Sequence, residues 1–191
     1  MTPTAAGSAP PAMLSKPVYE CPQSPLAPAR LRIVVAQDAR LHEIDELLAG
    51  CRADAAPVVL LSLYGKAQDG VPQHNYHDAD RLKGGLQGLL ADAVVGTRLY
   101  LCGDESFIWS MQRLALAGGL VEDEIEHLRV GSRRTVYCVH CATAQESDEA
   151  PEIVCSACGL RLTVREHFSR RLGAYMAVCT DADRPYAEGR R

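Results

Sequence analysis

Hydrophobic residues between positions 31 and 119 follow two alternating patterns, short continuous runs and helix-like repeats. Three runs of aliphatic and β-branched residues are typical of buried strands: LRIVVAQ (31–37), APVVLLSLYG (56–65) and TRLYLCG (97–103). Helical spacing predicts three helices: 39–51, 82–93 and 105–119. Gly50 is expected to end the first of them. The polar stretch 66–81 is expected to form a loop, and 122–131 leads out of this region.

The order of these elements is strand, helix, strand, helix, strand, helix, and this order predicts a class of fold. Such alternation gives a parallel sheet with right-handed crossover connections. Residues 31–131 are therefore expected to form an α/β domain with a small parallel Rossmann-like sheet. Ligands of such sheets lie at the carboxyl ends of the strands.

The pattern changes after residue 131, where short β-rich stretches flank pairs of cysteines. TVYCVHC (135–141) predicts a strand that runs into a tight turn, and IVCSACGLRLTVREHFS (153–169) predicts a strand, a turn and a strand. The acidic stretch 142–152 between them is expected to be a loop. This part of the chain is predicted to be a β module of the zinc-ribbon type.

The predicted domain organisation has four parts. An extended or disordered N-terminal arm is rich in Pro, Ala and Ser, and it precedes a domain of the nucleotide-binding type. A four-cysteine ribbon and a short tail follow. The boundaries are 1–30, 31–131, 132–183 and 184–191.

Four of the eight cysteines form two CxxC pairs, namely Cys138, Cys141, Cys155 and Cys158. Two CxxC turns aim four thiolates at one point, and this tetrahedral arrangement suits Zn²⁺ or a single iron ion. Because four protein ligands leave no open position, a structural zinc ion is the first expectation. The alternatives are a rubredoxin-like iron site, free thiols or a redox CxxC, and His140 is a candidate replacement ligand.

Composition and charge disfavour several classes of protein. The formal net charge is −4, which argues against a general nucleic-acid binder. No apolar stretch approaches the roughly 20 residues that a membrane span requires, and no basic residue precedes a hydrophobic run as in a secretory signal. With no sign of secretion, the cysteine content favours a reducing compartment, and a cytoplasmic location is expected.

Three further groups of residues carry weaker signals. A basic cluster fits a phosphate or acidic partner surface, or simply a solvated face: Arg165, His167, Arg170 and Arg171. His74 and His77 lie in a polar stretch without an evident third ligand, so they are expected to be ordinary surface residues. Phe107 and Trp109 are expected to pack in a core or at an interface.

The stretch GTRLYLCGDESFIWSMQRLALAGGLVEDEIEHL (96–128) resembles the last strand and helix of the nicotinamide-binding domain of ferredoxin reductase-like flavoenzymes. The resemblance implies that Cys102 lies beside a nicotinamide ring and that Gly103 permits close approach of the backbone, so NAD(P)H is a candidate cofactor. Two features depart from that family. The phosphate-binding stretch VVAQDARLHE has no glycine and carries Asp38, and Asp104 replaces a proline.

Taken whole, and above all in CGLRLTVREHFSRRLGAYMAV (158–178), the sequence resembles the small-subunit family of bacterial dimethylamine monooxygenases. The resemblance implies a non-autonomous subunit of an NAD(P)H-dependent haem monooxygenase that oxidatively demethylates dimethylamine. Partner subunits are expected to carry FMN, an iron–sulfur cluster and haem, while this chain organises the electron-transfer partners and the nicotinamide site. Two alternatives stay open, a rubredoxin-like one-electron carrier and a regulatory zinc-ribbon protein.

Overall fold

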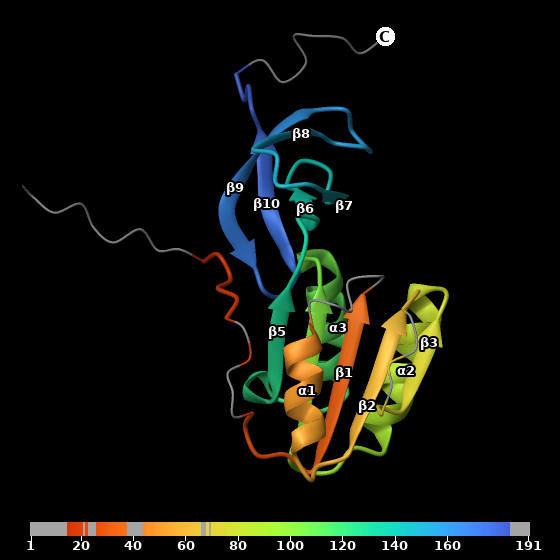
Figure 1. The fold of residues 1–191 in the computed structure, drawn as a ribbon. Helices are drawn as coiled ribbons and strands as arrows, with labels where there is room; N and C mark the ends of the chain where they lie inside the picture. Colours follow the sequence, from red (N-terminus) through yellow and green to blue (C-terminus); the bar gives the residue numbers. More distant parts are fainter. Residues whose placement is uncertain are drawn as a thin grey trace, which may run out of the picture.

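The computed structural model describes residues 15–20, 22, 26–37, 44–65, 68 and 70–183. Figure 1 shows two regions joined end to end, a parallel sheet covered by helices and a smaller sheet beyond its upper edge. Each sheet has five strands within the described residues. No helix in the described part of the chain is both long and apolar enough to cross a membrane.

The first sheet is parallel throughout and has the strand order β3-β2-β1-β4-β5. Its strands are β1 (Leu31–Gln37), β2 (Val58–Leu63), β3 (Gln73–Tyr76), β4 (Thr97–Gly103) and β5 (Ile125–Arg129). The chain adds β2 and β3 on one side of β1, then crosses over to add β4 and β5 on the other. The point where the direction reverses therefore lies between β1 and β4, where open α/β sheets bind their ligands.

Helices cover both faces of this sheet (Figure 1). They are α1 (Asp45–Ala53), α2 (Ala79–Ala91) and α3 (Glu105–Ala117), and a short 3₁₀ helix, η2 (Glu122–Glu124), precedes β5. Successive residues of β1 point to opposite faces, so Ile33 and Val35 pack with α2 and α3, whereas Val34 and Ala36 pack with α1. The chain therefore has the predicted α/β class, with a core on each side of the parallel sheet.

The second sheet is mixed and has the order β7-β6-β10-β9-β8. Its strands are β6 (Arg134–Cys138), β7 (Ala144–Ser147), β8 (Glu152–Val154), β9 (Arg161–Ser169) and β10 (Ala174–Cys179). β6 pairs in parallel with β10, and the other pairs are antiparallel. In Figure 1 the strands of this sheet curve, β9 most clearly.

Three strands lie where the sequence was interpreted as loop or connection, and those interpretations were wrong. β3 lies within 66–81, β5 within 122–131 and β7 within 142–152. Each is an edge strand of its sheet. An edge strand buries fewer side chains than a central one, so it needs no continuous apolar run and leaves a weaker pattern in the sequence.

The first helix also differs from the prediction at its C-terminal end. Gly50 does not end α1, which continues to Ala53. A Cβ atom at Gly50 would lie 3.4 Å from Cδ1 of Leu26, in ordinary van der Waals contact, so the N-terminal segment packs on this side of the helix. The predicted start of this helix, 39–43, lies outside the described residues.

Candidate metal centre and its junction with the parallel sheet

The four cysteines of the two CxxC pairs converge at one end of the second sheet. All four Sγ atoms of Cys138, Cys141, Cys155 and Cys158 lie within 4.8 Å of one another. Sγ of Cys138 is 3.9 Å from that of Cys158, and Sγ of Cys141 is 3.5 Å from that of Cys155. A tetrahedral zinc site with Zn–S bonds of about 2.3 Å has sulfurs about 3.8 Å apart, so this donor set fits a zinc or iron ion.

The two cysteine turns have the same backbone structure. In the first turn the amide of Ala142 donates to the carbonyl of Cys138, and in the second that of Gly159 donates to Cys155, each at 2.9 Å. The residue after each CxxC is in the left-handed region, with φ of 59° at Ala142 and 71° at Gly159. Glycine favours this conformation at Gly159, whereas alanine seldom adopts it.

The surroundings of Cys138 and Cys141 shift the pKa values of their thiols in opposite directions. A hydrogen bond from the Thr143 side chain lowers the pKa of Cys141 to about 6. Burial raises the pKa of Cys138 to about 12. Four thiolates so close together repel one another, and a bound divalent cation offsets that repulsion, because thiolates are the form that binds metal.

The core beneath these cysteines is small. Four apolar side chains and two of the cysteines form it: Val136, Leu160, Leu162, Ala177, Cys138 and Cys155. A core of this size stabilises a fold weakly, and small modules of this kind usually depend on a metal or on disulfides. The geometry therefore supports a structural role for an ion held by the four sulfurs.

Salt bridges fix the acidic stretch that follows the first cysteine turn to the residues that connect the two sheets. Arg129 pairs with Glu149, and Nη1 of Arg133 lies 2.9 Å from a carboxylate oxygen of Glu146. Arg134 donates to the carbonyl of Ala150 at 2.7 Å. The acidic stretch thus lies against the connection, although the Glu146 and Glu149 side chains stay more than half exposed.

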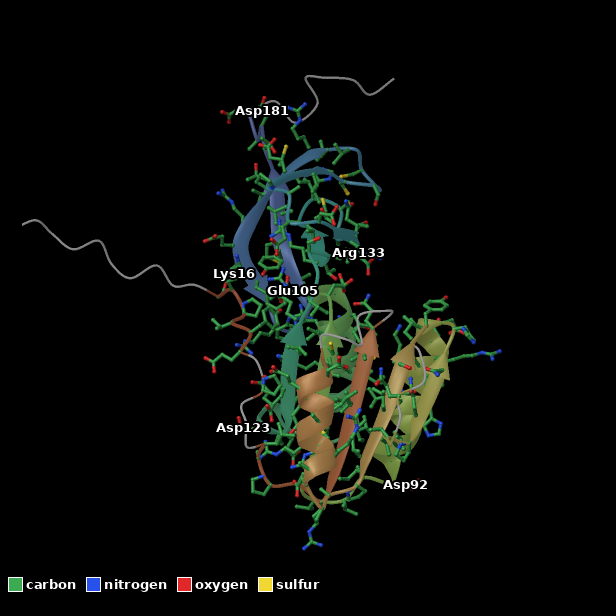
Figure 2. The ribbon with its side chains drawn as sticks, in the orientation of Figure 1. Lys16, Asp92, Glu105, Asp123, Arg133 and Asp181 are labelled. Atoms are coloured by element: carbon green, nitrogen blue, oxygen red, sulfur yellow. The ribbon has the colours of Figure 1, made fainter. Side chains whose placement is uncertain are left out.

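A buried carboxylate joins three separate parts of the chain at the junction (Figure 2). Glu105, the first residue of α3, is 1% exposed. Its Oε1 atom accepts hydrogen bonds from the hydroxyls of Tyr19 at 2.5 Å and of Tyr175 at 3.1 Å. The indole of Trp109 donates to the Tyr19 hydroxyl at 2.8 Å. This network ties the N-terminal segment and β10 to the start of α3.

Aromatic packing completes the junction. Trp109, Phe168 and Tyr175 form a buried cluster, and the Trp109 and Phe168 rings are 4.7 Å apart. Trp109 therefore packs at the interface between the two sheets, which is one of the two roles expected for it. Phe107 belongs to the core of the parallel sheet. His127 of β5 lies beside Trp109, and burial lowers its pKa to about 4.

The two residues assigned to a nicotinamide ring by resemblance lie at the end of β4, but neither faces open space. Cys102 is 1% exposed and packs on the α1 side of the sheet. A Cβ atom at Gly103 would lie 2.6 Å from Phe107 and 2.7 Å from Oε1 of Gln37. The glycine is therefore required by close packing in this structure, independently of any ligand.

Gln37, which sequence reasoning missed, bridges β1 and α3 across the switch point. Its Oε1 accepts from the Asp104 amide at 2.7 Å, and its Nε2 donates to the Asp104 carboxylate at 3.0 Å. Asp104 also caps α3 by accepting from the Phe107 amide at 2.9 Å. The residue that replaces the proline of the reductase family is thus an N-cap, and its charge occupies the helix end that would attract a phosphate. In the sequence, Gln37 could have been recognised as a polar residue at the end of a buried strand.

A cavity of about 180 Å³ opens between the starts of α2 and α3. Its lining includes residues from both sheets: Gln37, Leu63, Ala79, Lys83, Ser106, Phe107, Ser110, Met111 and Glu146. Ligand pockets for drug-sized molecules are about 300–1,000 Å³, so this cavity does not hold a whole dinucleotide. The predicted phosphate-binding stretch with Asp38 is only partly described, since residues 38–43 lie outside the described part.

The remaining predicted residues do not join the cysteine cluster. His140 is not among the grouped ligand atoms. His74 lies exposed on β3, and His77 contacts the ring of Tyr64, with the ring centres 5.9 Å apart. The basic cluster is exposed along β9 and the turn after it.

These features define a class of protein, an α/β domain with a five-stranded parallel sheet that is joined through a buried junction to a four-cysteine β module. The chain belongs to the DmmA-like family of dimethylamine monooxygenase subunits. The N-terminal domain of that family matches residues 11–125, and its C-terminal domain matches residues 135–178.

A curated relative and a solved structure illustrate what the chain is similar to. The chain is 52% identical over 102 residues to the heme-dependent oxidative N-demethylase delta subunit of Ectopseudomonas mendocina (strain ymp). That match spans 53% of this chain and 58% of the relative. The solved structure is phthalate dioxygenase reductase, at 14% identity and a TM-score of 0.42, covering 70% of this chain and 46% of that one.

Proposed function

We propose that this chain is a non-catalytic subunit of a haem-dependent oxidative N-demethylase, in which it holds the electron-transfer subunits in register. The observation that carries the proposal is the buried junction through Glu105, which fixes a reductase-like half-domain to a four-cysteine module. By its resemblance to the nicotinamide-binding domain of flavoenzymes, this sheet is proposed to work with a flavin that a partner subunit supplies. Membership of the DmmA-like family supports the same reading.

The reaction proposed for the complex is the demethylation of dimethylamine. One dimethylamine, one O₂, one NAD(P)H and one proton give methylamine, formaldehyde, water and NAD(P)⁺. The partner subunits are proposed to carry FMN, an iron–sulfur cluster and haem. We propose that the amine binds to those partners and that the contribution of this chain is their placement.

The metal proposed for Cys138, Cys141, Cys155 and Cys158 is zinc in a structural role. Four thiolates close the coordination sphere, and the distances between sulfurs fit a tetrahedral site. When bound, the ion supplies cross-links between the two turns and β6. Iron in the same position is the alternative, which would make this subunit a one-electron carrier.

The nicotinamide role of Cys102 and Gly103 stays a prediction. A nicotinamide ring reaches Gly103 only if the Gln37 side chain, whose Oε1 lies 2.7 Å from the position of a Cβ atom there, moves away. We therefore propose that any nicotinamide site at this edge is shared with the flavin-bearing partner and forms in the complex. In isolation the chain is expected to bind NADPH weakly.

Co-expression with the tagged haem and flavin subunits tests the proposed function. The chain is expected to co-purify with them at a fixed ratio, and NADPH-dependent formaldehyde release from dimethylamine is expected to fall when the chain is omitted. Wild-type chain that elutes alone, with the same activity in its absence, would contradict the proposal.

A further inference from the structure

The second sheet supports its two cysteine turns differently, although the turns have matching backbones. The amide of Cys138 donates to the carbonyl of Thr143, and the amide of Cys155 donates to that of Leu160, each at 2.9 Å. Cys138 is the last residue of β6, which has β7 on one side and β10 on the other. Cys155 follows β8, which is an edge strand. The sheet therefore supports the first turn from both sides and the second turn from one side.

The side chain of Gln145 supports the second turn on its other side. Its Nε2 atom donates to the carbonyl of Val154 at 3.1 Å, and its Oε1 atom accepts from the amide of Ser156 at 2.7 Å. These two backbone groups lie on either side of Cys155. A residue of a parallel neighbouring strand binds the same two groups, the carbonyl before and the amide after the residue that it faces. The side-chain amide of Gln145 thus takes the place of a strand beside Cys155.

This contact also joins the two opposite edges of the second sheet. Gln145 belongs to β7 and Val154 is the last residue of β8, and the strand order β7-β6-β10-β9-β8 places these strands at the two ends. Within the described residues, β7 and β8 form no ladder with each other. The side chain of Gln145 therefore connects the two edges where no ladder does, and it does so beside one of the four cysteines.

The backbone around Cys155 is consequently fixed on every side. Its own amide donates to Leu160, and its carbonyl accepts from Gly159 at 2.9 Å. Gln145 binds the carbonyl before Cys155 and the amide after it. Because all four groups are bonded, the Cys155 backbone can rotate only if at least one of these bonds breaks. The backbone therefore holds Sγ of Cys155 in place, 3.5 Å from Sγ of Cys141.

We infer that Gln145 is a positioning residue of the metal centre, an inference that rests on the metal binding proposed above. Gln145 does not contact the ion. It fixes the backbone of Cys155, and through Cys155 it slows the loss of the ion. Contacts that orient metal ligands in this way typically change metal affinity by about 10- to 100-fold. The rate of metal release carries the effect, because a thiolate that swings away from the ion must first break the bonds around its backbone.

The test replaces Gln145 by an uncharged side chain of similar length. Gln145→Met removes both hydrogen bonds, and Gln145→Asn keeps the amide but is too short to reach both backbone groups. Thr163→Val is the control, since it removes the hydrogen bond from Thr163 to Thr180 elsewhere in the same sheet. Each full-length chain is loaded with zinc, and release of the ion to a colorimetric chelator is timed without denaturant. The Co²⁺-loaded chains give visible d–d bands that report the symmetry of the four sulfurs, and urea unfolding measures the stability of each fold.

Gln145→Met is expected to release zinc about tenfold faster than wild type and to alter the Co²⁺ bands, with Gln145→Asn between the two. Thr163→Val is expected to stay within about twofold of wild type, with unchanged bands. Unchanged release and bands in both Gln145 variants, whether or not their urea stability falls, would assign Gln145 to the sheet alone and overturn the inference while leaving the metal site intact. A wild-type chain that binds neither ion would overturn the metal site and the inference together.

Discussion

The four-cysteine module and the carboxyl edge of the parallel sheet lie on either side of one junction, yet they differ in what they leave open. In the module, four sulfur atoms within 4.8 Å of one another converge around a common point. At the sheet edge, Gln37 and Asp104 bond to each other across the switch point, and Phe107 packs over Gly103. The first is a ligand set that fits an ion, whereas the second is filled by its own side chains.

The difference shows when a sequence motif alone is enough to predict a binding site. A CxxC pair determines its own geometry, because the turn that places the thiols is local. The Cys–Gly motif at the end of β4 depends on whatever lies opposite it, and here that is a glutamine from β1. The Cys–Gly motif therefore indicates the shape of the strand end, while a ligand there depends on distant residues.

The largest expected effect is the loss of one cysteine ligand. Cys155→Ser is expected to abolish metal binding and unfold the second sheet, because apparent binding free energies of structural zinc are on the order of 10 kcal/mol. Cys179→Ser, outside the cluster, is the control and is expected to retain the metal. Metal content per chain and circular dichroism measure both. A Cys155→Ser chain with wild-type metal content would show that this sulfur is not a ligand.

The next largest effect is a loss of folding stability at low pH, and it arises at His127 in the junction. Burial among Tyr19 and Trp109, with the charge of Arg170 nearby, lowers the pKa of His127 to about 4, below the value near 6.5 of an exposed histidine. The unfolded chain therefore takes up a proton before the folded chain does. Stability contributed by neutral His127 is present above pH 6.5 and is lost as the pH falls toward 4, by about 3 kcal/mol.

His127→Gln is expected to flatten this decline, whereas His74→Gln on exposed β3 is expected to leave it unchanged. Urea unfolding at a series of pH values between 7 and about 4 gives the comparison. Taking the difference between each variant and wild type cancels the acid sensitivity of the metal site. Parallel declines in wild type and His127→Gln would exclude His127 as the source.

Gly103→Ala tests whether side chains fill the space beside Gly103 at the carboxyl edge of the parallel sheet. The new Cβ atom would lie 2.6 Å from Phe107 and 2.7 Å from Gln37, so the variant is expected to be destabilised by about 2 kcal/mol. Gly88→Ala on α2 has no atom within 4 Å of the new Cβ and is expected to stabilise by about 0.5–1 kcal/mol. Denaturant unfolding of the isolated chain measures both changes. A neutral Gly103→Ala would mean that the edge is open in solution.

The smallest effect concerns the two cysteine turns. Ala142 has a φ of 59°, in the region that favours glycine, so Ala142→Gly is expected to stabilise the module by about 1 kcal/mol. Gly159→Ala, at the matching position, is expected to destabilise it by a similar amount. The denaturation midpoint of the metal-loaded chain measures the pair. Changes of the same sign would show that the two turns are not equivalent.

The central strands of the parallel sheet and the cysteine cluster could be predicted from the sequence, because their signals are local. The central strand β10 of the second sheet was not predicted. β1, β2 and β4 are continuous apolar runs, and the two CxxC pairs carry their own spacing. The edge strands β3, β5 and β7 were missed because half-exposed residues leave no such run. The junction was missed as well, since it joins Tyr19, Glu105 and Tyr175, which are far apart in sequence.

The most direct test of the account is the metal content and visible absorption spectrum of the purified full-length chain. The account predicts one zinc ion per chain, no visible colour, and loss of the second sheet when a strong chelator removes the ion. A stably folded chain without metal would contradict the structural role of the four cysteines. One iron ion per chain with a thiolate-to-iron charge-transfer spectrum would contradict the assignment of zinc and place this subunit within the electron path.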